Sequence, residues 1–138
     1  MSRAGTTGMP QRVDGMILFV DYNDVFRAPM AAALYTQKHG RRAYSAGVYA
    51  EEGAQLGDAI RPKRLRTHLA RQLSASMLAK ADEIWCVTAA IARHLTEEHP
   101  EASKKIHALP EISDPAGSGR DGYARCEQRI RRIVEEIP

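Results

Sequence analysis

Residues 16–34, MILFVDYNDVFRAPMAAAL, are the stretch that decides the fold of this chain. Residues 16–20 form a short, continuous apolar run, which predicts a strand buried on both faces of a parallel sheet. Pro29 stands near the start of an alanine-rich segment that Gly40 ends, and this order is typical of a helix. A buried strand followed by a loop and a helix predicts an α/β protein.

The rest of the chain continues this alternation. We expect the region around residues 51–66, which is rich in glycine and proline, to form turns with at most a short helix. The other expected elements are strands at 43–48, 81–87 and 105–109 and helices at 74–80, 88–98 and 121–136. Together they predict a three-layer α-β-α sandwich around a four-stranded parallel sheet.

Length and composition indicate one ordinary globular domain. The chain has 138 residues, enough for a single core, and no apolar run long enough to span a membrane. We interpret residues 1–14 as a flexible lead-in without the apolar segment of a signal peptide, and residues 15–138 as the domain. Two cysteines, Cys86 and Cys126, are too few for a disulfide framework, so we expect a reducing, cytoplasmic location.

The net charge of +3 arises partly from basic clusters within residues 61–71 and 125–132. Such clusters are usually solvated helix faces, and few aromatic residues and no nucleic-acid motif accompany them. We therefore expect neither nucleic acid nor a membrane as a partner.

The loop after the first strand is the candidate site. It runs from Asp21 to Arg27, and a helix N-terminus with free amide N–H groups follows it. Ligands of open parallel sheets also gather beyond the carboxyl ends of the strands. The position therefore predicts an anion-binding loop.

The run from Phe19 to Leu34 resembles the phosphate-binding loop of the low-molecular-weight tyrosine phosphatases and their arsenate reductase-like relatives. That loop has a cysteine, five intervening residues, an arginine and then Ser-Pro-Met. Residues 45–47 (SAG), 81–95 (ADEIWCVTAAIARHL) and 113–115 (SDP) are similar to later family segments, in the same order. The resemblance implies the phosphatase fold over nearly the whole chain after Val13.

The resemblance also implies roles for individual residues. In the family, a thiolate attacks phosphorus, an arginine clamps the phosphate and a distant aspartate protonates the leaving group. Arg27 and Asp114 match the arginine and the acid, and Tyr49 lies near the position of an aromatic residue that flanks the substrate. Tyr22 is a further candidate for lining the pocket. The nucleophile position is held by Asp21.

Other loop positions depart from the family pattern. Asn23 replaces a glycine, Asp24 an asparagine, Phe26 a second cysteine found in many members, and Ala28 the serine that supports the thiolate. Val25 completes the ligand-binding loop that we predict.

An aspartate at the nucleophile position argues against ordinary phosphatase chemistry. Two like charges at about 4 Å repel by roughly 4 kcal/mol at an effective dielectric near 20, and a phosphate dianion adds to this. The carboxylate of Asp21 can instead occupy the ring of loop amides and, we expect, form a bidentate pair with Arg27. Asp24 adds another negative charge.

Three interpretations remain open. In the first, the protein is a pseudophosphatase that binds or regulates without a cofactor, and its ligand is a small anion, a group that pairs with carboxylates, or a protein. In the second, Asp21, Asp24 and Asp114 perform new acid–base or metal-assisted chemistry. In the third, Asp21 is a Mg²⁺-dependent aspartyl nucleophile, as in haloacid dehalogenase-type phosphatases, which the loop superficially resembles.

The sequence holds few other candidates for chemistry. Cys86 and Cys126 lie at positions where we expect small buried hydrophobic residues rather than nucleophiles. The five histidines show no spacing typical of a metal site.

Overall fold

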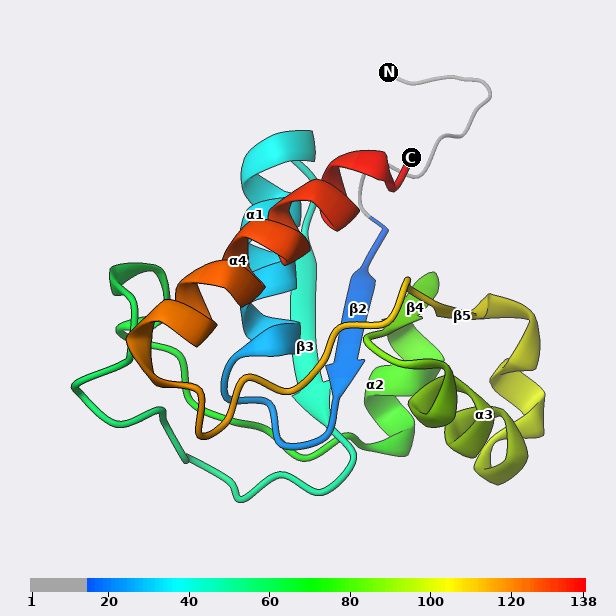
Figure 1. Ribbon diagram of the computed structural model, residues 1–138. Coiled ribbons are helices and arrows are strands. Elements are labelled where there is room, and N and C mark those ends of the chain that lie inside the picture. Colours follow the sequence, from blue (N-terminus) through cyan, green and yellow to red (C-terminus); the bar gives the residue numbers. More distant parts are fainter. Residues whose placement is uncertain (1–14) are drawn as a thin grey trace.

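A parallel sheet forms the centre of the protein (Figure 1). The computed structural model describes residues 15–138, so the predicted lead-in at residues 1–14 lies outside the described residues. Every neighbouring pair of strands is parallel, and their order across the described sheet is β3 (Ala43–Gly47), β2 (Ile17–Asp21), β4 (Glu83–Cys86) and β5 (Ile106–Ala108). The predicted fold class is confirmed.

The central strand β2 is buried along its whole length. Ile17 and Phe19 pack into the hydrophobic cluster on one face of the sheet, and Leu18 and Val20 pack into the cluster on the other. Successive strand side chains point to opposite faces, so a strand covered on both sides needs a continuous apolar run. This is why residues 16–20 could be recognised as a buried strand.

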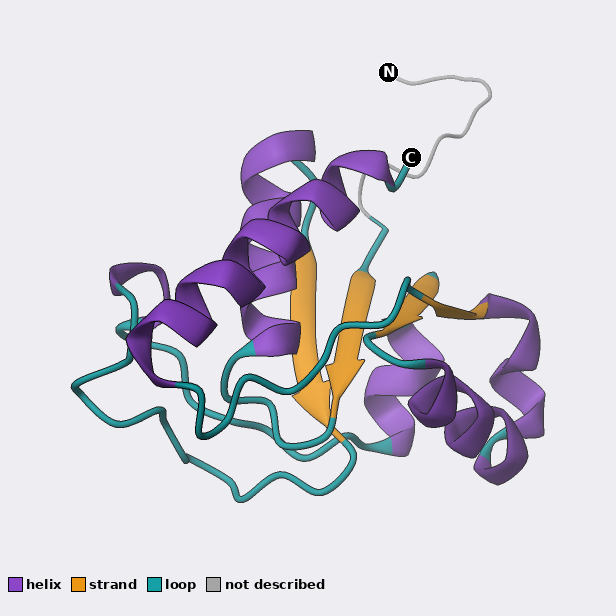
Figure 2. Ribbon diagram, viewed as in Figure 1, coloured by secondary structure: helices purple, strands orange, loops and turns teal. Residues whose placement is uncertain are grey.

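Helices cover both faces of the sheet (Figures 1 and 2). Residues of α1 (Arg27–His39) and α4 (Gly119–Glu136) contribute to one core cluster, and residues of α2 (Ala75–Lys80) and α3 (Ala89–Glu98) to the other. Two short 3₁₀ helices, η1 (Lys63–Leu65) and η2 (Pro100–Lys105), lie in the connections. No helix among residues 15–138 has the length and apolar character needed to cross a membrane.

The predicted helix ends are mostly confirmed. Gly40 closes α1 in the left-handed conformation, at φ 67°, and the side chains of Ser74 and Thr88 cap α2 and α3. Helix α1 begins at Arg27, three residues before Met30, where the alanine-rich segment predicted it to begin, because its first turn is formed within the loop that follows β2. That loop therefore leads directly into the helix.

Candidate functional site

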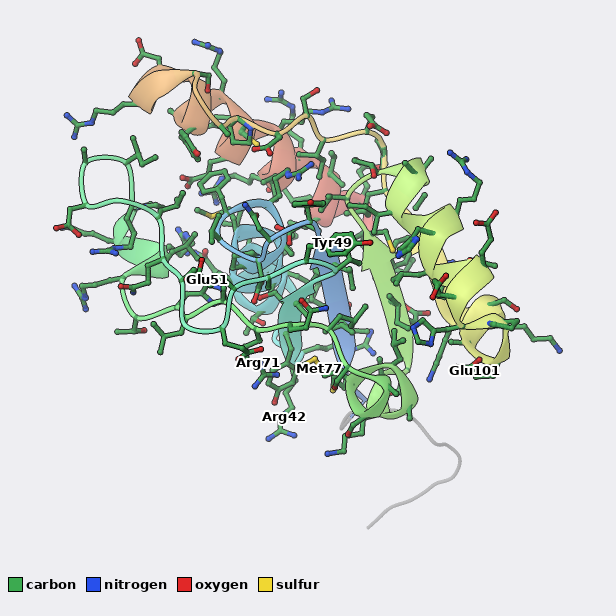
Figure 3. All side chains as sticks on the ribbon, turned by 90° about the horizontal axis from the view of Figure 1, so that it is seen from below. Arg42, Tyr49, Glu51, Arg71, Met77 and Glu101 are labelled. Atoms are coloured by element: carbon green, nitrogen blue, oxygen red, sulfur yellow. The ribbon has the colours of Figure 1, made fainter. Side chains whose placement is uncertain are left out.

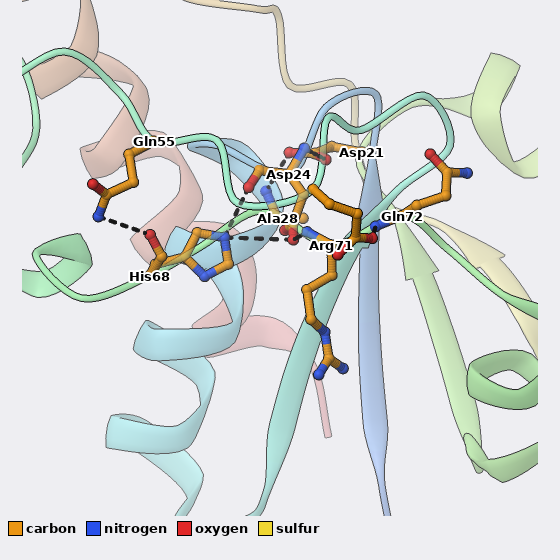
Figure 4. A network of polar contacts seen from close by, with 8 residues as sticks. Asp21, Asp24, Ala28, Gln55, His68, Arg71 and Gln72 are labelled. Atoms are coloured by element: carbon orange, nitrogen blue, oxygen red, sulfur yellow. Dashed lines mark hydrogen bonds and ion pairs between the residues drawn. The ribbon is translucent and has the colours of Figure 1, made fainter.

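Asp21 ends strand β2 and turns its side chain into the loop that follows. Its Oδ1 accepts a hydrogen bond from the backbone N–H of Asp24 at 2.7 Å, and its Oδ2 accepts one from the N–H of Ala28 at 2.9 Å (Figure 4). The residue before α1, Phe26, supplies no side-chain cap, so Asp21 provides it from seven residues upstream of Ala28. The carboxylate of Asp21 thus binds the loop amides, as predicted.

Burial of Asp21 is complete, with no solvent-exposed surface. This burial raises the pKa of its carboxyl to about 7, opposed by the N–H of Ala28 and assisted by the neighbouring charge of Asp24. A pKa near neutrality would suit an acid or a base. With no exposed surface, however, this carboxyl cannot contact a substrate in the conformation described.

Asp24 is held in a left-handed conformation, at φ 59°, and it is fully buried. Its Oδ2 accepts a hydrogen bond from the N–H of Arg71 at 2.8 Å and lies 3.4 Å from Nε2 of His68. The same Nε2 lies 2.7 Å from the carbonyl oxygen of Asp24 (Figure 4). Asp24 thus ties the loop to the segment that follows η1.

His68 is half-buried, and its environment acts on its pKa in two directions. Burial lowers the pKa of the imidazole, but contact with both the side chain and the backbone of Asp24 raises it more, so that the net direction is upward. The charge of Asp21 adds to the rise. Two buried carboxylates and one imidazole therefore form a coupled cluster beneath the loop.

The predicted bidentate pair between Asp21 and Arg27 is wrong. Nη1 of Arg27 donates to the carbonyl oxygen of Ile112 at 2.9 Å, and Nη2 lies 3.9 Å from Oδ2 of Asp114. The guanidinium is directed toward the loop that carries the predicted acid because the amides already satisfy the carboxylate of Asp21. Arg27 therefore links the two loops of the site.

Asp114 retains an exposed carboxylate, with 55% of its side chain accessible. Its Oδ1 accepts a hydrogen bond from the N–H of Ala116 at 3.0 Å, an arrangement common at the start of a turn. Asp21 and Asp24 have no exposed surface, so the three predicted carboxylates do not meet in one open cavity. Asp114 alone among them faces solvent substantially.

Two exposed tyrosines border the loop. The rings of Tyr22 and Tyr49 lie 5.3 Å apart, and 51% and 61% of these residues are exposed. In Figure 3, which looks onto the carboxyl-terminal edge of the sheet, Tyr49 lies over the strand ends. The predicted rim is therefore aromatic and open to solvent.

The remaining loop residues are either buried under the loop or partly exposed along it. Phe26 is buried and its ring packs edge-to-face on Tyr123, with ring centroids 4.9 Å apart. Ala28 is also buried, whereas Asn23 and Val25 are half-buried. Phe26 thus anchors the loop to α4.

Both thiols are buried, as predicted. Burial raises the pKa of Cys86 to about 12 and that of Cys126 to about 11. Neither is therefore a thiolate near neutral pH. Within residues 15–138, no group of three or more His, Cys, Asp or Glu side chains converges in a way that could hold a metal ion.

His68 and Arg71 were not among the predicted site residues. Both contact Asp24 across more than 40 residues of sequence. A spacing pattern cannot reveal such contacts; the only sequence signal for them is that Asp24, in place of an asparagine, adds a negative charge to the loop.

The chain is similar to known proteins in both sequence and fold. A family model described as "Low molecular weight phosphotyrosine protein phosphatase" matches residues 16–137. A "Protein-arginine-phosphatase" from Geobacillus stearothermophilus is 28% identical over 144 residues, which cover 94% of this chain and 95% of that protein.

Solved structures show the same likeness. The YwlE arginine phosphatase of Geobacillus stearothermophilus superposes with a TM-score of 0.79 at 27% identity, covering 88% of each chain. The tyrosine phosphatase Wzb from Escherichia coli K30, in complex with phosphate, has a TM-score of 0.80 at 18% identity, covering 89% of each chain. The second likeness concerns the fold alone.

Proposed function

Because this chain belongs to the low molecular weight phosphotyrosine protein phosphatase family, and because its loop closes around an internal carboxylate, we propose that it is a pseudophosphatase. It binds or regulates rather than hydrolyses. The observation that carries the proposal is the position of Asp21, which is hydrogen-bonded to two loop amides and fully buried. The residue that stands where the resemblance requires a nucleophile is engaged as an acceptor and shielded from any substrate.

Arg27 and Asp24 support the same proposal. The guanidinium of Arg27 is bonded to Ile112, on the loop that carries Asp114. Asp24 adds a second buried carboxylate to the loop, and its negative charge opposes the binding of a phosphate dianion nearby. These features favour a pocket that repels phosphate.

The pocket mouth favours a group that pairs with carboxylates, presented by a protein partner. The exposed faces of Tyr22 and Tyr49 attract cations, and Asp114 offers an exposed carboxylate. A guanidinium can stack on an aromatic face and can pair with a carboxylate, and the similar protein from Geobacillus stearothermophilus is described as an arginine phosphatase. We place the protein in the cytoplasm and assign it an unphosphorylated cationic side chain as ligand.

The first test is hydrolysis. We expect the purified protein to hydrolyse neither p-nitrophenyl phosphate nor phosphoarginine above the uncatalysed rate, with or without Mg²⁺. Metal-independent turnover would contradict the proposal. Turnover that requires Mg²⁺ and disappears in Asp21→Asn would instead establish the aspartyl-nucleophile alternative.

The matched variant is Asp21→Cys. It should recover little activity because Asn23, Asp24 and Ala28 also depart from the family loop. Strong recovery would show that Asp21 alone blocks hydrolysis. Binding is tested separately by thermal stabilisation, which an arginine-containing peptide should produce without turnover and its alanine analogue should not.

A further inference from the structure

A groove of about 510 Å³ opens beside the filled loop, between α1, β3 and the segment that follows η1. Its size lies within the range of small-molecule sites. None of the loop residues 21–28 lines it. The groove therefore adjoins the loop through His68 and Arg71 without being lined by residues 21–28, and it does not depend on the function proposed above.

Small side chains form one wall of the groove. Ala32 and Ala33 on α1 are too small to fill the space beside them, and Leu65 of η1 lines the same space. At its edge lie Tyr44 and Leu69, which are 37% and 55% exposed. An exposed leucine and a tyrosine beside a concave surface offer apolar contact to a ligand with an apolar body.

Three basic groups also line the groove, from Arg64, His68 and Arg71. No acidic residue is among the described residues that line it. Arg64 donates to the neutral amide of Gln37 at 2.7 Å, so this contact leaves its charge uncompensated. In Figure 4 the side chains of His68 and Arg71 both lie on the side of α1 and β3.

We propose that this groove binds a small organic anion, with an apolar body packed against Tyr44 and Leu69 and a phosphate or carboxylate group held by Arg64 and Arg71. Charge complementarity defines the anionic group, since guanidinium groups bind such oxygens through paired, charge-assisted hydrogen bonds. Hydroxyl groups of Ser45 and Thr67 also line the groove and can donate to the same oxygens.

The test is an NMR titration of the ¹⁵N-labelled full chain with phenyl phosphate, with inorganic phosphate as the comparison. We expect saturable shifts at the amides of Ser45 and Leu69, and an affinity for phenyl phosphate at least about tenfold above that for inorganic phosphate. Equal affinities would overturn the role of the apolar body. Shifts confined to residues 22–28, or no saturable shifts at millimolar ligand, would overturn the site.

Two variants locate the charge. The double variant Arg64→Ala with Arg71→Ala should weaken phenyl phosphate binding at least about tenfold, because it removes both guanidinium groups. Arg93→Ala, an exposed arginine on α3, is the control and should change binding less than about twofold. Equal losses in both proteins would show only general attraction by the basic surface and would overturn the proposal. All three side chains are exposed, so folding should be retained, which thermal unfolding verifies.

Discussion

Two strand-to-helix turns at the same edge of the sheet cap their helices differently. Between β4 and α3, the hydroxyl of Thr88 accepts a hydrogen bond from the N–H of Ile91 at 3.1 Å, a common neutral cap. Between β2 and α1, the carboxylate of Asp21 caps Ala28 from the end of the strand. The first arrangement is local and carries no charge, whereas the second encloses a charge within the protein.

The difference shows that one turn only caps its helix, whereas the other keeps the shape of a binding loop. A side-chain cap satisfies only some of the four free N–H groups at a helix start, and a hydroxyl can do this without the cost of burying an ion. The longer turn keeps the shape of an anion-binding loop and fills it with a carboxyl whose pKa is raised to about 7 by burial. The turn between β2 and α1 is therefore more elaborate than a helix cap requires, and its shape is that of a binding site.

The largest expected effect comes from removing that charge with Asp21→Asn. The folded pKa of Asp21, about 7, lies above the usual aspartate value of 3.8, so the native state loses stability as the pH rises from about 4 to about 7. A shift of this size corresponds to at most about 4 kcal/mol. The free energy of unfolding, measured with urea, should therefore fall more between pH 5 and pH 8 for the wild type than for Asp21→Asn.

The same comparison isolates Asp21 from His68. The raised pKa of His68 also favours the native state at low pH, and the part of this contribution that comes from Asp24 is present in both proteins; only the smaller part due to the charge of Asp21 is lost in the variant. Parallel pH dependences would mean that the pKa of Asp21 in the folded protein lies near its usual value, as it would if the loop opened to solvate the carboxylate.

The next effect comes from Gly47→Ala, which tests how tightly the longer turn is packed. A Cβ atom on Gly47 would lie 2.7 Å from the carbonyl oxygen of Tyr22 and 2.9 Å from the amide nitrogen of Asp24. The loop would have to move, at a cost of about 1–3 kcal/mol in unfolding free energy. Gly57→Ala is the control, since nothing lies within 4 Å of its Cβ position, and equal effects in chemical denaturation would show that the loop yields freely.

The smallest effect is expected at the neutral cap. Thr88→Ala should cost about 1 kcal/mol of unfolding free energy, because it removes one acceptor from the first turn of α3. The loss should be the same at pH 5 and pH 8, and Thr88→Ser, which keeps the hydroxyl, should show little of it. If the loss of unfolding free energy in Thr88→Ala varied with pH, the two turns would not differ as a neutral and a charged cap.

Local features made most of the fold predictable. The apolar run of β2, the glycine after α1 and the cap at Thr88 each act within a few residues, so sequence patterns reveal them. The start of α1 was placed too late because Asp21 caps the helix from a distance and draws its first turn into the loop.

The position of Asp21 among the loop amides could be predicted, but the partners of the other charged side chains could not. Burial of Asp21 among the loop amides was expected, yet Arg27 bonds to Ile112, 85 residues away. Which partner a guanidinium selects depends on how loops distant in sequence lie in space. The ties of Asp24 to His68 and Arg71 were missed for the same reason.

The carboxylate of Asp21 has a consequence for binding, because it behaves as a ligand tethered to its own receptor. Even flexible short tethers give effective concentrations in the millimolar range, and a side chain fixed at a strand end is better placed still. An external oxyanion must therefore compete with an internal one for the N–H groups of Asp24 and Ala28. Since protonation neutralises the tethered competitor near pH 7, the loop should admit outside anions most readily in acid.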